Sequence, residues 1–189
     1  MTMLVVQSST EELPELEALI ERRRALGLDT FDEWWEGVYR VVGGPSPEHG
    51  LVVARLCALL LGRCDPLGLW VVTPMNVGID KWDAKVPDIA VTRPDTARTS
   101  PAYMATAELV VEIMSPREIR GEKLPFYAAW NVKEYLEVDL PNGTVRLLAN
   151  RDGTWEPIDS SEVIELTVGE VLALVTTGST TGSGSTGGE

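Results

Sequence analysis

The chain has 189 residues, of which 44% are hydrophobic and 24% are charged, and its formal net charge is −13. This composition is typical of a globular protein rather than a disordered one, and the length allows one full hydrophobic core but not two comfortable domains. The negative charge argues against broad nonspecific adhesion to nucleic acid, because proteins that bind a polyanion usually carry a basic face, although it leaves room for a local basic groove.

The longest apolar run, residues 56–61, is far shorter than the roughly 20 residues that a membrane-spanning helix needs. The N-terminus shows no signal peptide pattern, so we expect a cytoplasmic protein with no membrane partner. Cys57 and Cys64 fall on one side of an expected helix without further cysteine or histidine ligands. We expect both to be reduced thiols in or near the core.

The first predicted element is an acidic amphipathic helix over residues 11–27, which ends at a glycine. Residues 31–42 predict a short helix or turn followed by a strand, closed by a Gly-Gly-Pro sequence. Ser46 is expected to be the N-cap of a second helix with Pro47 at its first position, running to about Arg63.

Three strands are predicted next, at residues 69–79, 86–92 and 109–114, with Pro74 marking a bend or a sheet edge in the first. A helix follows from about Lys123 to Trp130, because Pro125 is tolerated only in a first turn. Alternation predicts a strand at 134–139, residues 145–148 and 155–158 predict a hairpin, and residues 168–175 a closing helix.

Two of the predicted strands each hold one acid among apolar neighbours. In residues 109–114, Glu112 shares its face with Val110 and Met114, so its surroundings are mostly apolar. An ionised acid buried without a partner is costly, and such groups normally shift their pKa, pair with a cation or bind a metal. Asp88 and Glu112 are therefore the leading candidates for a shared metal site.

Glu48 and Lys123, at the starts of the two expected central helices, complete a set of residues suited to phosphodiester hydrolysis. Carboxylates hold Mg²⁺, which keeps several waters and is usually completed by substrate phosphate. Such an ion polarises the phosphoryl group and lowers the pKa of its bound water. A lysine beside it can orient the nucleophile and neutralise developing charge.

These residues resemble a known family in four segments: VPDIAV (86–91), LVVEIMSP (109–116), GEKL (121–124) and VKEYLEVD (132–139). Together they are similar to the Uma-two family, a restriction-endonuclease-like family of the PD-(D/E)XK nuclease superfamily. The resemblance extends over roughly residues 31–175 and includes Glu48 and His49. It implies that Asp88 and Glu112 are the acidic ligands of Mg²⁺ or Mn²⁺.

The resemblance implies an α/β (α+β) fold with a restriction-endonuclease-like core, in which a central mixed sheet is flanked by helices. We expect this domain over residues 31–176, with a C-terminal β-hairpin, after an N-terminal helical extension over residues 1–30. Residues 177–189 contain mainly Gly, Ser and Thr, which predicts a flexible tail.

The chain departs from the superfamily pattern at one position. That pattern puts a lysine two residues after the second acid, where this chain has Met114. In the resembling family the lysine role is usually assigned to the following helix, and Lys123 matches that place. A lysine on another element can reach the same point in space, so Lys123 is the expected catalytic lysine.

Each metal-site candidate has a structural alternative. Asp88 could belong to a turn after Pro87, and Glu112 could form a salt bridge with Lys123 or an arginine. Lys123 could be an ordinary solvated lysine. Glu48 could be a third metal contact or could simply favour the positive end of its helix.

The candidate phosphate contacts have alternatives as well. His49, the only histidine, could contact a scissile phosphate or could be an ordinary residue at a helix start. Arg117 and Arg120 follow the second acid and could bind phosphates of the substrate, or they could be exposed loop arginines.

Three functions follow from these residues. The first is a Mg²⁺-dependent endonuclease that hydrolyses DNA, expected to be a homodimer, with Asp88, Glu112, Lys123, Glu48 and His49 as the catalytic group. The second is a binding or scaffold module that keeps the nuclease fold without turnover and pairs through its tryptophans. The third is a metal-dependent enzyme acting on a smaller phosphate ester.

Overall fold

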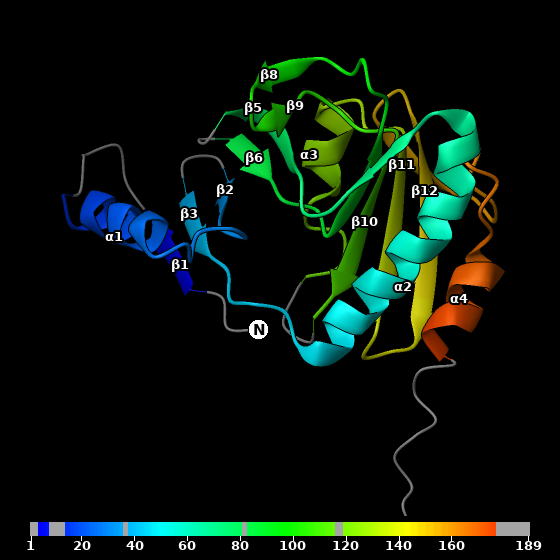
Figure 1. Cartoon of the computed structure of the whole chain (residues 1–189), viewed down its shortest axis with the longest axis horizontal. Helices are drawn as coiled ribbons and strands as arrows, with labels where there is room; N and C mark the ends of the chain where they lie inside the picture. The colour runs from blue at the N-terminus through cyan, green and yellow to red at the C-terminus, as the bar shows by residue number, and fades with distance from the viewer. Residues whose placement is uncertain (1–3, 8–13, 36–37, 81–82, 116–118, 177–189) are drawn as a thin grey trace, which may run out of the picture.

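Two mixed β-sheets and four α-helices make up the described part of the chain in a computed structural model, which covers residues 4–7, 14–35, 38–80, 83–115 and 119–176. The predicted α+β class is confirmed by this architecture. Figure 1 shows the two sheets side by side, with the N-terminal strands and helix α1 (Pro14–Ala25) at one end of the molecule.

The six-stranded sheet forms the centre of the domain, in the order β13-β12-β11-β10-β7-β4. Strands β10 and β11 run parallel, and the other neighbours are antiparallel. A parallel pair needs a long connection, which here includes helix α3 (Leu124–Ala129). The strands are β4 (Trp70–Val72), β7 (Ile89–Thr92), β10 (Leu109–Met114), β11 (Glu134–Asp139), β12 (Thr144–Arg151) and β13 (Thr154–Pro157).

Helices cover both faces of this sheet: α2 (Pro47–Cys64) and α4 (Val168–Thr176) lie on one face and α3 on the other (Figure 1). Leu109, Val111 and Ile113 belong to the core under α2 and α4, whereas Val110 packs in the core that includes Tyr127 of α3. The predicted alternation of β10 is confirmed. Glu112 therefore projects to the α3 side of the sheet.

Helix α2 begins where its capping sequence predicts. The Ser46 hydroxyl accepts the N–H of His49 at 3.2 Å, and Pro47 occupies the first helical position, where a missing N–H is harmless. Its buried side chains recur every four residues and form the stripe that packs on the sheet, at Val52, Leu56, Leu60 and Cys64. Both cysteines are free thiols, as predicted.

The seven-stranded sheet was not predicted as a separate layer. Its order is β1-β3-β2-β6-β5-β9-β8, and β5 and β9 run parallel within it. The prediction of one central sheet flanked by helices applies to the six-stranded sheet alone. The strands of the additional sheet are β1 (Leu4–Gln7), β2 (Glu33–Trp35), β3 (Val38–Val41), β5 (Asn76–Asp80), β6 (Asp83–Lys85), β8 (Arg98–Ser100) and β9 (Tyr103–Met104).

Two local predictions were wrong. Residues 31–42 begin in a turn, as predicted, but they then form two antiparallel strands, β2 and β3, where one strand was predicted. Residues 69–79 form two strands in different sheets, β4 and β5, instead of one. The break falls at Pro74, which has no N–H to continue a β-ladder. Strands β2 and β3 of this sheet lie beside the start of α2, with which they line one cavity.

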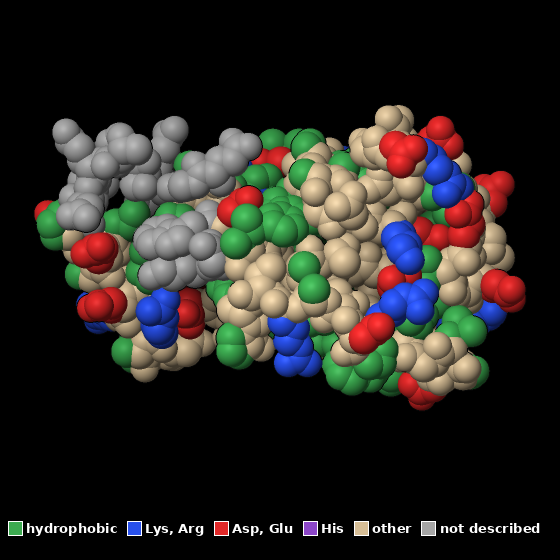
Figure 2. Space-filling model, turned by 90° about the horizontal axis from the view of Figure 1, so that it is seen from above, with side chains coloured by type: hydrophobic (Ala, Val, Ile, Leu, Met, Phe, Trp, Pro, Cys, Tyr) green, Lys and Arg blue, Asp and Glu red, His purple; other side chains and the backbone are tan. Residues whose placement is uncertain are grey.

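Charged side chains are interspersed on the face seen in Figure 2, where Lys and Arg alternate with Asp and Glu rather than forming a basic stripe. Any contact with a polyanion on that face would have to be local. Among the helices of the described residues, none has the length and apolar character needed to cross a membrane.

Candidate active site

One cavity of about 190 Å³ brings together most of the predicted site residues. Helix α2 contributes His49, the segment before β7 contributes Asp88, β10 contributes Glu112, and the residue before α3 is Lys123. These four come from separate parts of the sequence, and each was selected on sequence grounds. The cavity also contains Glu33 of β2, which was not.

Asp88 is held by both of its carboxylate oxygens. Its Oδ2 accepts the backbone N–H of Ile113 at 2.7 Å, and its Oδ1 lies 2.9 Å from Nε2 of His49. Its own carbonyl accepts the hydroxyl of Thr73 at 2.7 Å. The contact with Ile113, the residue after Glu112, fixes the two acids beside each other at the junction of β7 and β10.

Glu112 is buried, with 7% of its surface exposed. Its Oε2 lies 3.0 Å from Nζ of Lys123, and its Oε1 accepts the hydroxyl of Tyr127 at 2.5 Å. Burial raises the pKa of Glu112 above its ordinary value, against the opposing attraction of the Lys123 ammonium. The salt bridge considered above as a structural alternative for Glu112 is therefore present.

Lys123 is not the solvated lysine considered as its alternative, since its side chain is only 19% exposed. Its Nζ lies between two carboxylates, 3.0 Å from Glu112 and 2.9 Å from Oε1 of Glu33. Burial on its own would lower the pKa of Lys123, but these two carboxylates outweigh burial and raise that pKa well above its ordinary value. The side chain is held as an ammonium ion.

Two residues of the cluster were missed in the sequence. Glu33 accepts the N–H of Val86 and the indole N–H of Trp35, each at 2.8 Å, and it was missed because β2 was not recognised as a strand. Tyr127 was detectable, because it follows Lys123 by four residues and so shares its face of α3. Both residues contact the Glu112–Lys123 pair, and Glu33 also lines the cavity.

The remaining predicted residues lie elsewhere. Glu48 is exposed at the first turn of α2, and hydrogen bonds with its own backbone and with Ser46 lower its pKa, as expected for a residue at a helix N-terminus. Arg120 pairs with Glu137 at 3.2 Å and with Asp139, outside the cavity lining. Arg117 falls outside the described residues.

The donor set suits a hard divalent cation, although no group of three or more His, Cys, Asp or Glu placed to hold a metal occurs in the described residues. Asp88 and Glu112 offer carboxylate oxygens at one cavity, and each oxygen keeps a lone pair beyond the contact already made. Mg²⁺ is usually held by one or two carboxylates and completed by water and substrate phosphate. Two acids therefore fit this ion.

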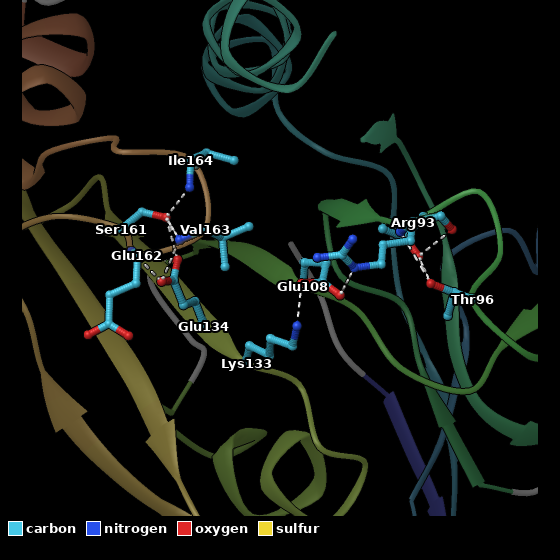
Figure 3. Close-up of polar contacts among 10 residues, drawn as sticks. Arg93, Thr96, Glu108, Lys133, Glu134, Ser161, Glu162, Val163 and Ile164 are labelled. Atoms are coloured by element: carbon cyan, nitrogen blue, oxygen red, sulfur yellow. Dashed lines mark hydrogen bonds and ion pairs between the residues drawn. The ribbon is translucent and has the colours of Figure 1, made fainter. Parts of the chain in front are cut away.

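Other buried acids have structural contacts instead (Figure 3). Glu108 pairs with Arg93 at 3.0 Å and with Lys133 at 2.7 Å, and both cations are more than half exposed. Glu134 accepts a hydrogen bond from the Ser161 hydroxyl at 2.5 Å and from the backbone N–H groups of Glu162 and Val163. These bonds connect the loop between β13 and α4 to β11. These acids lie at the opposite ends of β10 and β11 from the cavity.

The architecture is that of the restriction-endonuclease-like fold class. The model of the Uma2 family, described as "Putative restriction endonuclease", matches residues 16–177, so the chain belongs to this family. This is the Uma-two family that the sequence resembles, and the predicted family is confirmed.

A similar solved structure is the crystal structure of "a putative nuclease belonging to DUF820 from Anabaena variabilis ATCC 29413". It is 14% identical to this chain, with a TM-score of 0.60 over 76% of this chain and 90% of that one. At this identity the match shows the shared fold alone. No protein of curated function matches the chain.

Proposed function

We propose that the protein is a nuclease that hydrolyses DNA phosphodiester bonds with Mg²⁺ or Mn²⁺ held by Asp88 and Glu112. The observation that carries this proposal is the position of Lys123, whose ammonium reaches Glu112 at 3.0 Å from the start of α3. The cation that the superfamily pattern places at position 114 is supplied here by another element. The nuclease family and the shared fold support the same assignment.

Each residue of the cavity has a role in this reaction. The bound ion would polarise the phosphoryl group and lower the pKa of its water. Lys123 neutralises the negative charge that develops on the phosphoryl oxygens and orients the attacking water. Tyr127 and Glu33 hold the Glu112–Lys123 pair in place. His49 orients Asp88 through its Nε2 and lines the cavity that the phosphate would enter.

The peripheral candidates have secondary roles in the proposal. Glu48 would contact the metal only through a water, because its carboxylate is exposed at the helix start and outside the cavity lining. Arg117 and Arg120 would contact phosphates flanking the one that is cut. We further propose a cytoplasmic homodimer whose nuclease domain spans residues 31–176, a state that light scattering coupled to gel filtration would test.

The direct test is cleavage of labelled DNA by the purified protein in Mg²⁺ or Mn²⁺, with EDTA as the metal-free reference. Asp88→Asn and Glu112→Gln should each abolish cleavage, because each removes a charged ligand. Asp95→Asn is the matched control, since Asp95 is an exposed acid outside the cavity lining, and it should leave the rate unchanged. Cleavage that survives both site substitutions would disprove the assignment.

One observation favours a second function, a nuclease-fold scaffold without turnover. Both carboxylate oxygens of Glu112 already have protein partners, Lys123 and Tyr127, so the acid is satisfied without a metal. A scaffold would show no cleavage of DNA and no stabilisation by millimolar Mg²⁺ or Mn²⁺. Metal-dependent stabilisation that requires Asp88 would exclude it.

A further inference from the structure

The cavity that holds the acids is mainly apolar, a property that phosphodiester hydrolysis does not require. Beside the charged residues, its lining includes the apolar side chains of Phe31, Trp35, Val42, Val53, Pro74 and Val86. A phosphate group brings its own charge and water, and it gains nothing from such a wall. The ligand of the whole cavity must therefore carry an apolar part next to its phosphate.

A nucleotide with its base unstacked has this combination. In a paired duplex the bases are stacked inside, and a protein meets phosphates and groove edges. A flipped or single-stranded nucleotide instead exposes a flat apolar ring, which proteins receive in pockets between aromatic and apolar side chains. At about 190 Å³ the cavity is smaller than the ~300–1,000 Å³ of sites for drug-sized ligands, which suits one ring system.

Arg40 adds a feature suited to a base. Its guanidinium carbon lies 3.6 Å from the centroid of the Trp35 ring, and its NH2 donates to Glu122 at 2.9 Å. The guanidinium plane is thus fixed on one face by the indole, and Arg40 also lines the cavity. Arginine planes fixed in this way are stacking surfaces for unpaired bases.

We propose that this cavity binds one unpaired nucleobase of the strand that is cut, with the phosphate of that nucleotide next to Asp88 and Glu112. This inference rests on the proposed function. The substrates are then single strands, or duplexes with an extruded nucleotide, in preference to fully paired DNA. Base stacking is worth about 1–3 kcal/mol per base in single-strand binding, so we expect a preference of about five- to 150-fold.

Gly50 offers a clean way to block the cavity. It lines the cavity from α2, and a Cβ added there meets no heavy atom within 4 Å. Gly50→Leu should fill the space while strengthening the helix, since glycine in a helix interior costs up to about 1 kcal/mol. Gly62→Leu is the matched control, because Gly62 is in the same helix with equally open surroundings but lies outside the cavity lining.

The experiment measures binding of a fluorescein-labelled oligonucleotide by anisotropy in Ca²⁺, as a single strand, as a blunt duplex and as a strand of abasic nucleotides. Wild type and Gly62→Leu should bind the single strand about tenfold more tightly than the duplex, and the abasic strand no better than the duplex. Gly50→Leu should lose this preference and keep its affinity for the duplex. Val53→Phe, one turn further along α2, should repeat the result and covers the case in which Gly50→Leu does not fold.

Two results would overturn the inference. The first is that the wild type binds single strand and duplex equally, or binds neither. The second is that Gly50→Leu and Val53→Phe both retain the preference for the single strand. The failure of the proposed function would be seen separately, as absence of Asp88-dependent cleavage of every DNA form in Mg²⁺ or Mn²⁺. Cleavage of paired and unpaired DNA at equal rates would leave the nuclease assignment standing and remove the base-binding one.

Discussion

Glu112 of β10 and Glu137 of β11 are direct neighbours in the parallel register, and both are buried on the same face of the sheet. Different cations neutralise them. Glu112 pairs with Lys123 inside the cavity, whereas Glu137 pairs with Arg146 at 2.9 Å and Arg120 at 3.2 Å outside it. The two acids share chemistry, burial and strand environment, and they differ in access to the cavity.

This pair predicts which acid responds to metal. We expect millimolar Mn²⁺ to raise the melting temperature of the wild type by a few degrees, because at about ten times Kd a ligand stabilises by about 1.4 kcal/mol. Glu112→Gln should abolish this shift and Glu137→Gln should keep it, although Glu137→Gln should lower the melting temperature itself. Differential scanning fluorimetry in Mn²⁺ and in EDTA measures both quantities, and an equal metal response in the two variants would contradict the site.

Lys123 should also be important for stability. Lys123→Met leaves Glu112 and Glu33 buried without their shared cation, and breaking a buried pair from one side costs about 3–5 kcal/mol. Lys133→Met is the control: Lys133 also pairs with a buried acid, Glu108, but it is 56% exposed, so we expect at most about 1 kcal/mol. Urea unfolding gives both free energies, and comparable losses would contradict the buried role of Lys123.

A substitution at Met114 should restore part of the stability that Lys123→Met loses. Met114 lies on the same face of β10 as Glu112, two residues along the strand, and it shares a small cavity of about 30 Å³ with Glu112 and Lys123. A lysine at 114 can therefore direct its ammonium to Glu112. Met114→Lys combined with Lys123→Met should be more stable than Lys123→Met alone in urea. A double variant that is less stable than the single one would show that the site accepts a cation only from α3.

The sequence predicted the parts of this site that depend on local patterns. The apolar run of β10 and the alternation of β11 predicted the bounds of both strands, and the capping sequence Ser46-Pro47 placed His49 at the start of α2. The two faces of this strand also predicted that Glu112 is buried on the side of β10 opposite Leu109, Val111 and Ile113. These features depend on the residue spacing and on capping, which a single sequence displays.

The contacts between separate elements were not predictable in the same way. Glu33 reaches Lys123 because the seven-stranded sheet packs against the start of α3, an arrangement set by tertiary packing over 90 residues of separation. The sequence likewise offered Lys123 as a candidate without showing that its ammonium reaches Glu112. Pro74 predicted a break in the strand at residues 69–79, but it did not predict that the chain passes from one sheet to the other there.

The hydrogen bond from the Tyr127 hydroxyl to Glu112 can be tested by its contribution to stability. Tyr127→Phe removes the hydroxyl that donates to Glu112 at 2.5 Å and leaves a buried carboxylate oxygen without that donor, which we expect to cost about 1–3 kcal/mol. Tyr135→Phe is the matched control, because Tyr135 is equally buried but its hydroxyl makes only a 3.4 Å contact with Glu137. Its loss should be smaller. Urea unfolding of the two variants compares them, and an equal cost would assign the effect to packing alone.

Lys85 is buried in β6 beneath the cavity wall, 3% exposed. Its Nζ donates to the carbonyl of Trp34 at 3.0 Å and lies over the rings of Trp35 and Phe126. Burial lowers the pKa of Lys85 to about 8, and the carboxylates of Glu33 and Asp83 offset only part of this effect. The folded protein therefore holds a lysine that gives up its proton at mildly alkaline pH.

This shift predicts that stability increases with pH over a defined window. The unfolded chain keeps the Lys85 proton up to a pKa near 10.4, whereas the folded protein releases it near 8, so between these values the unfolded state binds more protons and the free energy of unfolding rises with pH. The gain is at most about 3 kcal/mol, because each pKa unit is worth about 1.36 kcal/mol and the two rings favour the ammonium. Urea unfolding at pH 7 and at pH 9.5 should show this rise in the wild type relative to Lys85→Met, a comparison that removes the titration of every other group. If the two proteins have the same pH dependence, Lys85 keeps its proton in the folded state throughout, and the aromatic rings rather than burial decide its charge.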